Sequence, residues 1–225
     1  MPTSWTDYLS PLKELFVFWV KRMVNRNKGG GNMYNAFSCF MGNDDIDVLI
    51  EYFKKYFAQF EVDVGVKPFE SANIPDCIQT EWNVLNYKGY LYKQRDGHSI
   101  YIDNTGESWC SLIWNVALTN KLDCLTAMIY DTPPYPGYKL CRYFDGKERV
   151  IQNIKDGSKW CFFQKGEVCS FENTGYYAMK RGAKKFDYEI MKEYLVKLGL
   201  NIEDNDFWTP KGEKFLFYRL LRGQQ

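Results

Sequence analysis

His98 and Cys110 are the residues whose types could together form a nucleophilic site. Cys110 follows the single histidine of the chain by 12 residues, and an imidazole within hydrogen-bond reach can activate a thiol. His98 lies in the turn RDGHS, so an exposed turn histidine is the competing interpretation. An enzyme that uses His98 and Cys110, or a pair of carboxylates, therefore stays an alternative. The chain has no nucleophile elbow and no phosphate-binding glycine loop, which favours a protein that is not an enzyme.

An acidic cluster, Asp44, Asp45 and Asp47, precedes an apolar helical pattern. Its spacing lacks the alternation and the distant glutamate of a calcium loop. We therefore expect Asp44 to cap the helix, with Asp45 and Asp47 in its first turn, and we expect no bound metal or cofactor. Residues 33–86 carry nine acids and three bases. The three aspartates are therefore candidate contacts for a basic protein partner.

Two tyrosines, Tyr135 and Tyr138, lie in and just after the proline-rich loop DTPPYPG at 131–137. A stiff backbone that carries large rings loses little entropy on contact, as recognition loops do. Tyr135 and Tyr138 are therefore candidate partner contacts. In the alternative interpretation, both rings fold back onto the core.

A basic cluster at 180–185 precedes a well-marked helix, which Asp187 would cap and Gly199 would end. Positive charge near a helix N-terminus is unfavourable unless an acid compensates it. An external anion is one candidate, but internal carboxylates, with Glu172 and the acids at 203–206 as candidates, are favoured. The candidate anion-binding residues are Lys180, Arg181, Lys184 and Lys185.

Residues 1–32 are expected to form a separate unit, a basic amphipathic helix followed by a glycine linker. The apolar run at 15–20 is too short to span a bilayer, and no secretion signal is present, so membrane contact could arise only through residues 10–28. The seven cysteines include no C-x-x-C pair, which is typical of reduced thiols in the cytoplasm. The net charge of +1 argues against nucleic-acid binding.

The remaining residues, 33–225, predict a single α+β domain, a mostly antiparallel sheet with three to four packed helices, and a candidate sub-boundary near 131–137. Short β-prone runs separated by Gly, Asn and Asp turns predict the strands. Helices are expected after Asp44, around 109–122 and after Asp187. The expected strands are 34–41, 61–66, 83–86, 90–94, 99–103, 125–130, 138–144, 148–154, 160–164 and 168–171.

Residues 117–208 carry a recognisable order of motifs. The strand pair DGSKWCFFQKGEVCSFE is followed by Tyr-Tyr, the basic stretch, the capped helix and the acidic sequence DNDFW. This order resembles the C-terminal module of small bacterial proteins, some of which are encoded beside polymorphic or contact-dependent toxins as immunity proteins. In that pattern the basic stretch continues as R-I-x-D-R-F, whereas residues 181–186 keep its charge and phenylalanine but lose its apolar and acidic positions. The resemblance implies no active site.

Three functional hypotheses follow from these features. The favoured one is a cytoplasmic, non-catalytic bacterial immunity-type protein that binds and neutralises a cognate, basic toxin domain, as in toxin–antitoxin pairs. The others are the enzyme described above and a membrane- or phosphate-binding protein that uses the N-terminal helix and the 180–185 cluster. The oligomeric state is not predicted.

Overall fold

The described strands form one antiparallel sheet in the computed structural model, which describes residues 36–42, 45–59, 64–69, 87–94, 97–105, 110–130 and 136–219. The strand order within these residues is β2-β9-β3-β4-β1-β5-β6-β7-β8, and each neighbouring pair is antiparallel. The strands are β1 (Ala36–Phe40), β2 (Val64–Pro68), β3 (Lys88–Lys93), β4 (Ser99–Asp103), β5 (Cys124–Tyr130), β6 (Gly137–Phe144), β7 (Lys147–Asp156), β8 (Lys159–Lys165) and β9 (Lys214–Arg219).

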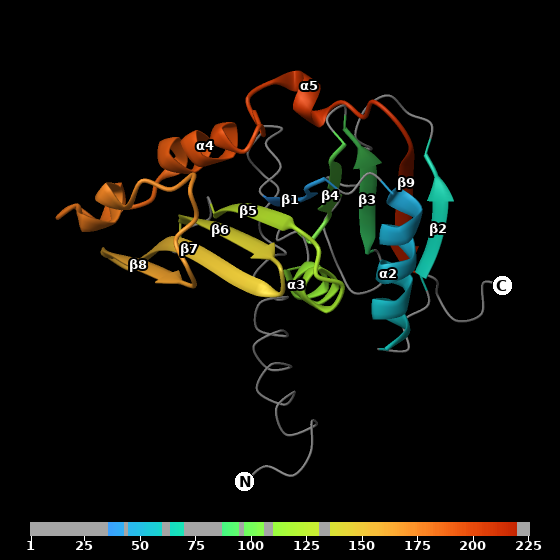
Figure 1. Cartoon of the computed structure of the whole chain (residues 1–225). Helices are drawn as coiled ribbons and strands as arrows, with labels where there is room; N and C mark the ends of the chain where they lie inside the picture. The colour runs from blue at the N-terminus through green and yellow to red at the C-terminus, as the bar shows by residue number, and fades with distance from the viewer. Residues whose placement is uncertain are drawn as a thin grey trace, which may run out of the picture.

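Helices lie on both faces of this sheet (Figure 1). The helices α2 (Ile46–Ala58) and α3 (Cys110–Thr119) cover one face, and α4 (Tyr188–Lys197) and α5 (Asn205–Trp208) cover the other. Two 3-10 helices, Thr174–Ala178 and Gly182–Lys184, lead from β8 towards α4. The expected fold class, a mostly antiparallel sheet with three to four packed helices, is therefore confirmed.

Two hydrophobic clusters result, because successive residues of a strand point to opposite faces. On β3, Tyr90 and Tyr92 pack with the α4 cluster, whereas Leu91 packs with the α2 and α3 cluster. Phe53 of α2 meets Tyr101 of β4 at a ring-centroid distance of 5.1 Å. The sheet is therefore buried on both faces along its centre.

Several elements form where local chemistry predicts them. The expected strand at 99–103 coincides with β4. The Asp187 carboxylate accepts a hydrogen bond from the Ile190 backbone N–H at 3.2 Å, and Gly199 ends α4 at φ +81°. The strands β5 and β6, on either side of the candidate sub-boundary, pair from Cys124 to Tyr130. The N-terminal unit at 1–32 and the expected strand at 83–86 lie outside the described residues.

Candidate interaction surface

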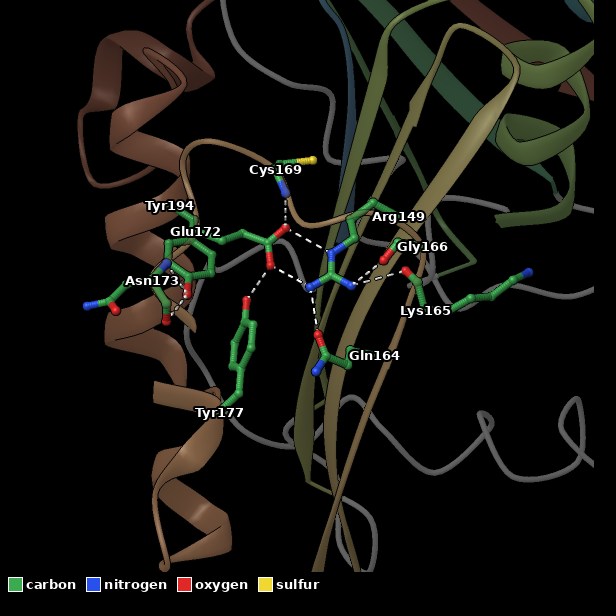
Figure 2. A network of polar contacts seen from close by, with 9 residues as sticks. All are labelled: Arg149, Gln164, Lys165, Gly166, Cys169, Glu172, Asn173, Tyr177 and Tyr194. Carbon is green, nitrogen blue, oxygen red and sulfur yellow. Dashed lines mark hydrogen bonds and ion pairs between the residues drawn. The ribbon is translucent and has the colours of Figure 1, made fainter. Parts of the chain in front are cut away.

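A buried ion pair joins β7 to the chain that follows β8. Arg149 of β7 and Glu172 have side chains that are 6% and 0% exposed. The guanidinium makes two parallel contacts with the carboxylate: Nε donates to Oε1 at 2.8 Å, and Nη2 donates to Oε2 at 2.5 Å (Figure 2). This bidentate geometry fixes the relative orientation of the two side chains as well as the distance between them.

Other polar groups complete the hydrogen bonding of this ion pair. The Cys169 backbone N–H donates to Glu172 Oε1 at 2.8 Å, and the Tyr177 hydroxyl donates to Oε2 at 2.6 Å. Arg149 Nη1 donates to the Gly166 carbonyl oxygen at 3.0 Å, and Nη2 donates to the Gln164 side chain at 2.8 Å. The network thus anchors residues 164–177 to β7, and we call it the Arg149–Glu172 clamp.

The acid–base properties of the clamp follow from these contacts. Burial raises the pKa of Glu172, but the hydrogen bonds from Arg149, Tyr177 and Cys169 outweigh it, and the pKa lies below its usual value. The pKa of Tyr177 is raised well above its usual range by burial and by the hydrogen bond that its hydroxyl donates to Glu172. The carboxylate is therefore ionised and the phenol is neutral near pH 7.

The clamp also explains why one expected strand is wrong. Residues 168–171 were expected to pair with β8 across Lys165-Gly166-Glu167, but they form a loop and a turn. The Cys169 N–H donates to Glu172, and the Gly166 carbonyl oxygen accepts from Arg149, so these groups serve the clamp instead of a strand ladder. Consequently β8 is the last strand at this end of the described sheet.

Large apolar side chains are exposed around β6–β8. Phe144 is the last residue of β6, Phe163 lies on β8, and Val168 lies in the loop after β8; they are 55%, 51% and 54% exposed. Phe162 packs into the α4 cluster, so the alternation of the strand points Phe163 to the opposite face. Its cross-strand partner there is Gln152 of β7. The scaffold thus presents isolated aromatic side chains on well-anchored strands.

This end of the molecule is also basic. Residues 137–185 carry eleven basic and five acidic side chains, although the chain as a whole has a net charge of +1. Lys165 pairs with Glu148 at 2.7 Å, and Lys147 pairs with Glu167 at 3.1 Å. Lys159 forms no ion pair with any described residue and is exposed. The surface around β8 therefore attracts negative charge.

The basic cluster at 180–185 is only partly compensated. Lys184 pairs with Asp187 at 2.9 Å, so the compensating acid is the helix cap and not Glu172 or an acid at 203–206. Lys185 Nζ lies 5.6 Å from the centroid of the Phe162 ring. Lys180 and Arg181 are exposed and have no ion-pair partner in the described part of the chain. Lys184 therefore has an internal acidic partner, which agrees with the favoured interpretation, although the acid is Asp187.

The predicted partner contacts do not form one surface. Asp44 and Tyr135 lie outside the described residues. Asp45, and not Asp44 as expected, caps α2, because its carboxylate accepts from the Val48 N–H at 3.2 Å; Asp47 lies in the first turn. The cap is one residue later because the helix begins at 46.

Tyr138 lies far from the aspartates along the strands. It is half-buried and pairs with Ile129, near the end of β5, on the side where β1 begins. Asp45 follows Phe40, at the other end of β1. Tyr138 also packs with the α4 cluster, whereas α2 covers the opposite face. Burial raises the pKa of Tyr138, and the Asp187 charge raises it further.

His98 and the start of α3 contact different ends of α2. His98 Nδ1 accepts a hydrogen bond from the Gly42 N–H at 3.1 Å, just before α2. Cys110 begins α3, and the next residue, Ser111, meets the Tyr56 hydroxyl near the end of α2 at 3.5 Å. The length of α2 between these points is about 15 Å. His98 thus contacts the chain just before α2, whereas α3 begins near the other end of α2; the Cys110 side chain lies outside the described part of the structure, so the Cys–His version of the enzyme hypothesis stays a prediction.

No known family model, curated protein or solved structure matches the chain. Within the described residues, no group of three or more His, Cys, Asp or Glu side chains is arranged to hold a metal ion. None of the helices in the described ranges is long and apolar enough to cross a membrane. The resemblance of residues 117–208 to immunity proteins stays a prediction.

Sequence reasoning missed the surface around β8. The lysines at 159 and 165 and the adjacent Phe162-Phe163 pair were visible, but the expected strand at 168–171 would have covered β8 and hidden its edge. The clamp was also missed, because the pairing of Arg149 with Glu172 depends on burial across 23 residues of chain.

Proposed function

We propose that the protein is a non-catalytic, protein-binding module of the immunity type, which binds and neutralises a cognate toxin domain in the cytoplasm. The observation that carries the proposal is the exposure of Phe144, Phe163 and Val168 on strands and a loop anchored by the Arg149–Glu172 clamp. Aromatic side chains on a rigid scaffold lose little conformational entropy on contact, and such residues dominate binding energies in interfaces.

The charge around these residues supports the same proposal. Exposed Lys159 and Lys165 flank Cys161 and Phe163 on one face of β8, as polar rims flank the apolar centres of protein interfaces. A toxin domain could be neutralised by occlusion of its active site, which requires shape and charge complementarity but no catalytic group. The expectation that Asp45 and Asp47 contact a basic toxin surface is a separate proposal, for the start of α2.

Growth rescue tests the proposal. Each open reading frame adjacent to the gene is expressed in a bacterial host, with and without this protein. We expect one product to stop growth and the protein to restore it. Phe163→Ala should weaken rescue, while Trp114→Ala, which removes a similarly exposed ring from α3, should not. A toxic neighbour that is unaffected by the wild-type protein, or the absence of any toxic neighbour, would contradict the proposal.

A further inference from the structure

The outer edge of β8 is a ready site for another strand. β8 pairs with β7 from Lys159 to Lys165, and no described strand pairs with its other edge. An unpaired edge presents alternating N–H and C=O groups that an extended peptide can complete. The Arg149–Glu172 clamp holds the chain directly after this strand, through the Gly166 and Lys165 carbonyl oxygens at 3.0 and 3.3 Å. The edge is therefore ordered before any partner arrives.

The side chains along this edge follow a simple pattern. Phe162 packs into the α4 cluster, so the alternate residues of β8 point to the other face. Helix α3 packs on β5 and β6 and leaves this part of the face open (Figure 1). The residues on the open face are, in order, Lys159, Cys161, Phe163 and Lys165, and all four are exposed. A lysine thus stands at each end of a short apolar centre.

The positive charge of Lys159 and Lys165 limits which strands can pair with the outer edge of β8. In a second copy of the chain, antiparallel pairing centred on Phe162 would place Lys159 opposite Lys165 twice, and facing like charges destabilise a strand pair. The N-terminal unit at 1–32, with five bases and two acids, has the same sign as the edge. An acidic strand avoids both conflicts. Lys165 already pairs with Glu148, so Lys159 is the stronger of the two acid-binding positions.

We propose that β8 pairs with an extended acidic segment of the partner protein. The segment has the pattern acidic-x-apolar-x-apolar-x-acidic. Its apolar residues pack beside Cys161 and Phe163, and its acidic residues lie opposite Lys159 and Lys165. The pattern reads the same in both directions, so it fits parallel and antiparallel addition alike. The inference rests on the proposed protein-binding function and specifies the chemistry of the partner.

Fluorescence anisotropy with labelled peptides tests the proposal directly. The probe is E-T-V-T-V-T-E, and the phase control E-V-T-T-T-V-E has the same composition and charge but moves both valines to the other face. We expect the probe to bind about tenfold more tightly than the phase control, because only its valines lie beside Phe163. Two N-methylated versions of the probe are compared, one methylated at its odd-numbered residues and one at its even-numbered residues. Only the version whose methyl groups replace the N–H groups that face β8 should fail to bind. Equal binding of probe and phase control would show a general polyanion site and overturn the proposal, as would no binding at all.

Variants of the chain locate the site. Lys159→Glu should weaken probe binding about tenfold, and Phe163→Ala about threefold, whereas Lys55→Glu, the same charge change on exposed α2, should have no effect. Circular dichroism checks that each variant is folded, and backbone amide exchange in β8 should slow when the probe binds. If the β8 variants lose the probe but retain toxin rescue, the edge is not the toxin site and the inference fails alone. If the wild type rescues growth from no toxic neighbour but still binds the probe more tightly than the phase control, the proposed toxin function fails and the specificity of the β8 edge stands.

Discussion

Glu172 shows how much one buried carboxylate can determine. It has no exposed side-chain surface, and it accepts from a guanidinium, a phenol and a backbone N–H. A buried charge is tolerated only when it is paired and hydrogen-bonded, and removal of one partner leaves the other charge uncompensated. The placement of the chain after β8 therefore depends on this side chain.

The first prediction concerns Glu172→Gln. The variant should lower the free energy of unfolding by about 3 kcal/mol, since it leaves Arg149 buried without a counter-charge. Urea denaturation at pH 7 measures this loss. Glu167→Gln is the matched control, because Glu167 makes an exposed ion pair with Lys147 and should cost less than about 1 kcal/mol. Equal effects at the two positions would contradict the role of the clamp.

The second prediction concerns the pH dependence of stability. The pKa of Glu172 in the folded protein lies below the ordinary value of 4.5, so its contribution is present above that value and is lost as the pH falls through the folded pKa. The stability difference between the wild type and Glu172→Gln should therefore shrink below about pH 4.5. Urea denaturation between pH 7 and pH 3 checks this, and a difference that stayed constant with pH would refute it.

At the scale of elements, the turn after β8 depends on a glycine. Gly166 has φ +88°, and a Cβ there would lie 2.1 Å from the Glu148 carbonyl oxygen. Gly157, in the turn between β7 and β8, has φ +57° but open space around its Cα. The two positions share a left-handed backbone and differ in the space for a side chain.

The third prediction compares these glycines. Gly157→Ala should cost about 1 kcal/mol, the typical penalty for a left-handed non-glycine residue. Gly166→Ala should cost at least about 3 kcal/mol, because the backbone of β7 must also move. Thermal unfolding of the two variants gives the comparison. If both variants unfolded at the same temperature, the close approach to Glu148 would not constrain the turn.

Elements with strong local signals could be predicted from the sequence. The run at 99–103 and the capped helix after Asp187 form as expected, because turn residues and caps act within a few residues. The strand expected at 168–171 fails because Glu172 recruits the Cys169 N–H into the clamp, a long-range effect. For the same reason no local pattern could identify β8 as an edge strand. Asp45 and Tyr138 also show that two plausible contact residues can lie at opposite ends of a sheet.

At the scale of the whole molecule, β8 is a terminal strand of the described sheet and carries a lysine at each end. Natural edge strands often carry lysine, because a charged neighbour opposes pairing with other copies. Lys159 and Lys165 stand at the two ends of β8, with Phe162 at its centre. Without these charges, the edge would combine unpaired backbone groups with exposed aromatic surface.

The fourth prediction follows from this arrangement. The double variant Lys159→Thr/Lys165→Thr should self-associate in a concentration-dependent manner, while the wild type does not associate through this edge. Light scattering coupled to size-exclusion chromatography measures the mass of each. The control is Lys54→Thr/Lys55→Thr, which removes two charges from α2 and should not change the mass relative to the wild type. A double variant that kept the mass of the wild type at all concentrations would refute the protective role.

The position of β9 has a consequence for how the chain folds during synthesis. Among the described strands, β2 pairs only with β9, and β9 also pairs with β3. β9 begins at Lys214, whereas β2 ends at Pro68, so β2 leaves the ribosome long before its pairing strand exists. Chains grow at about 5–20 residues per second. The 146 residues between these positions take about 7–30 s to synthesise, so β2 waits that long for its pairing strand while β1, β4, β5 and β6 can already pair.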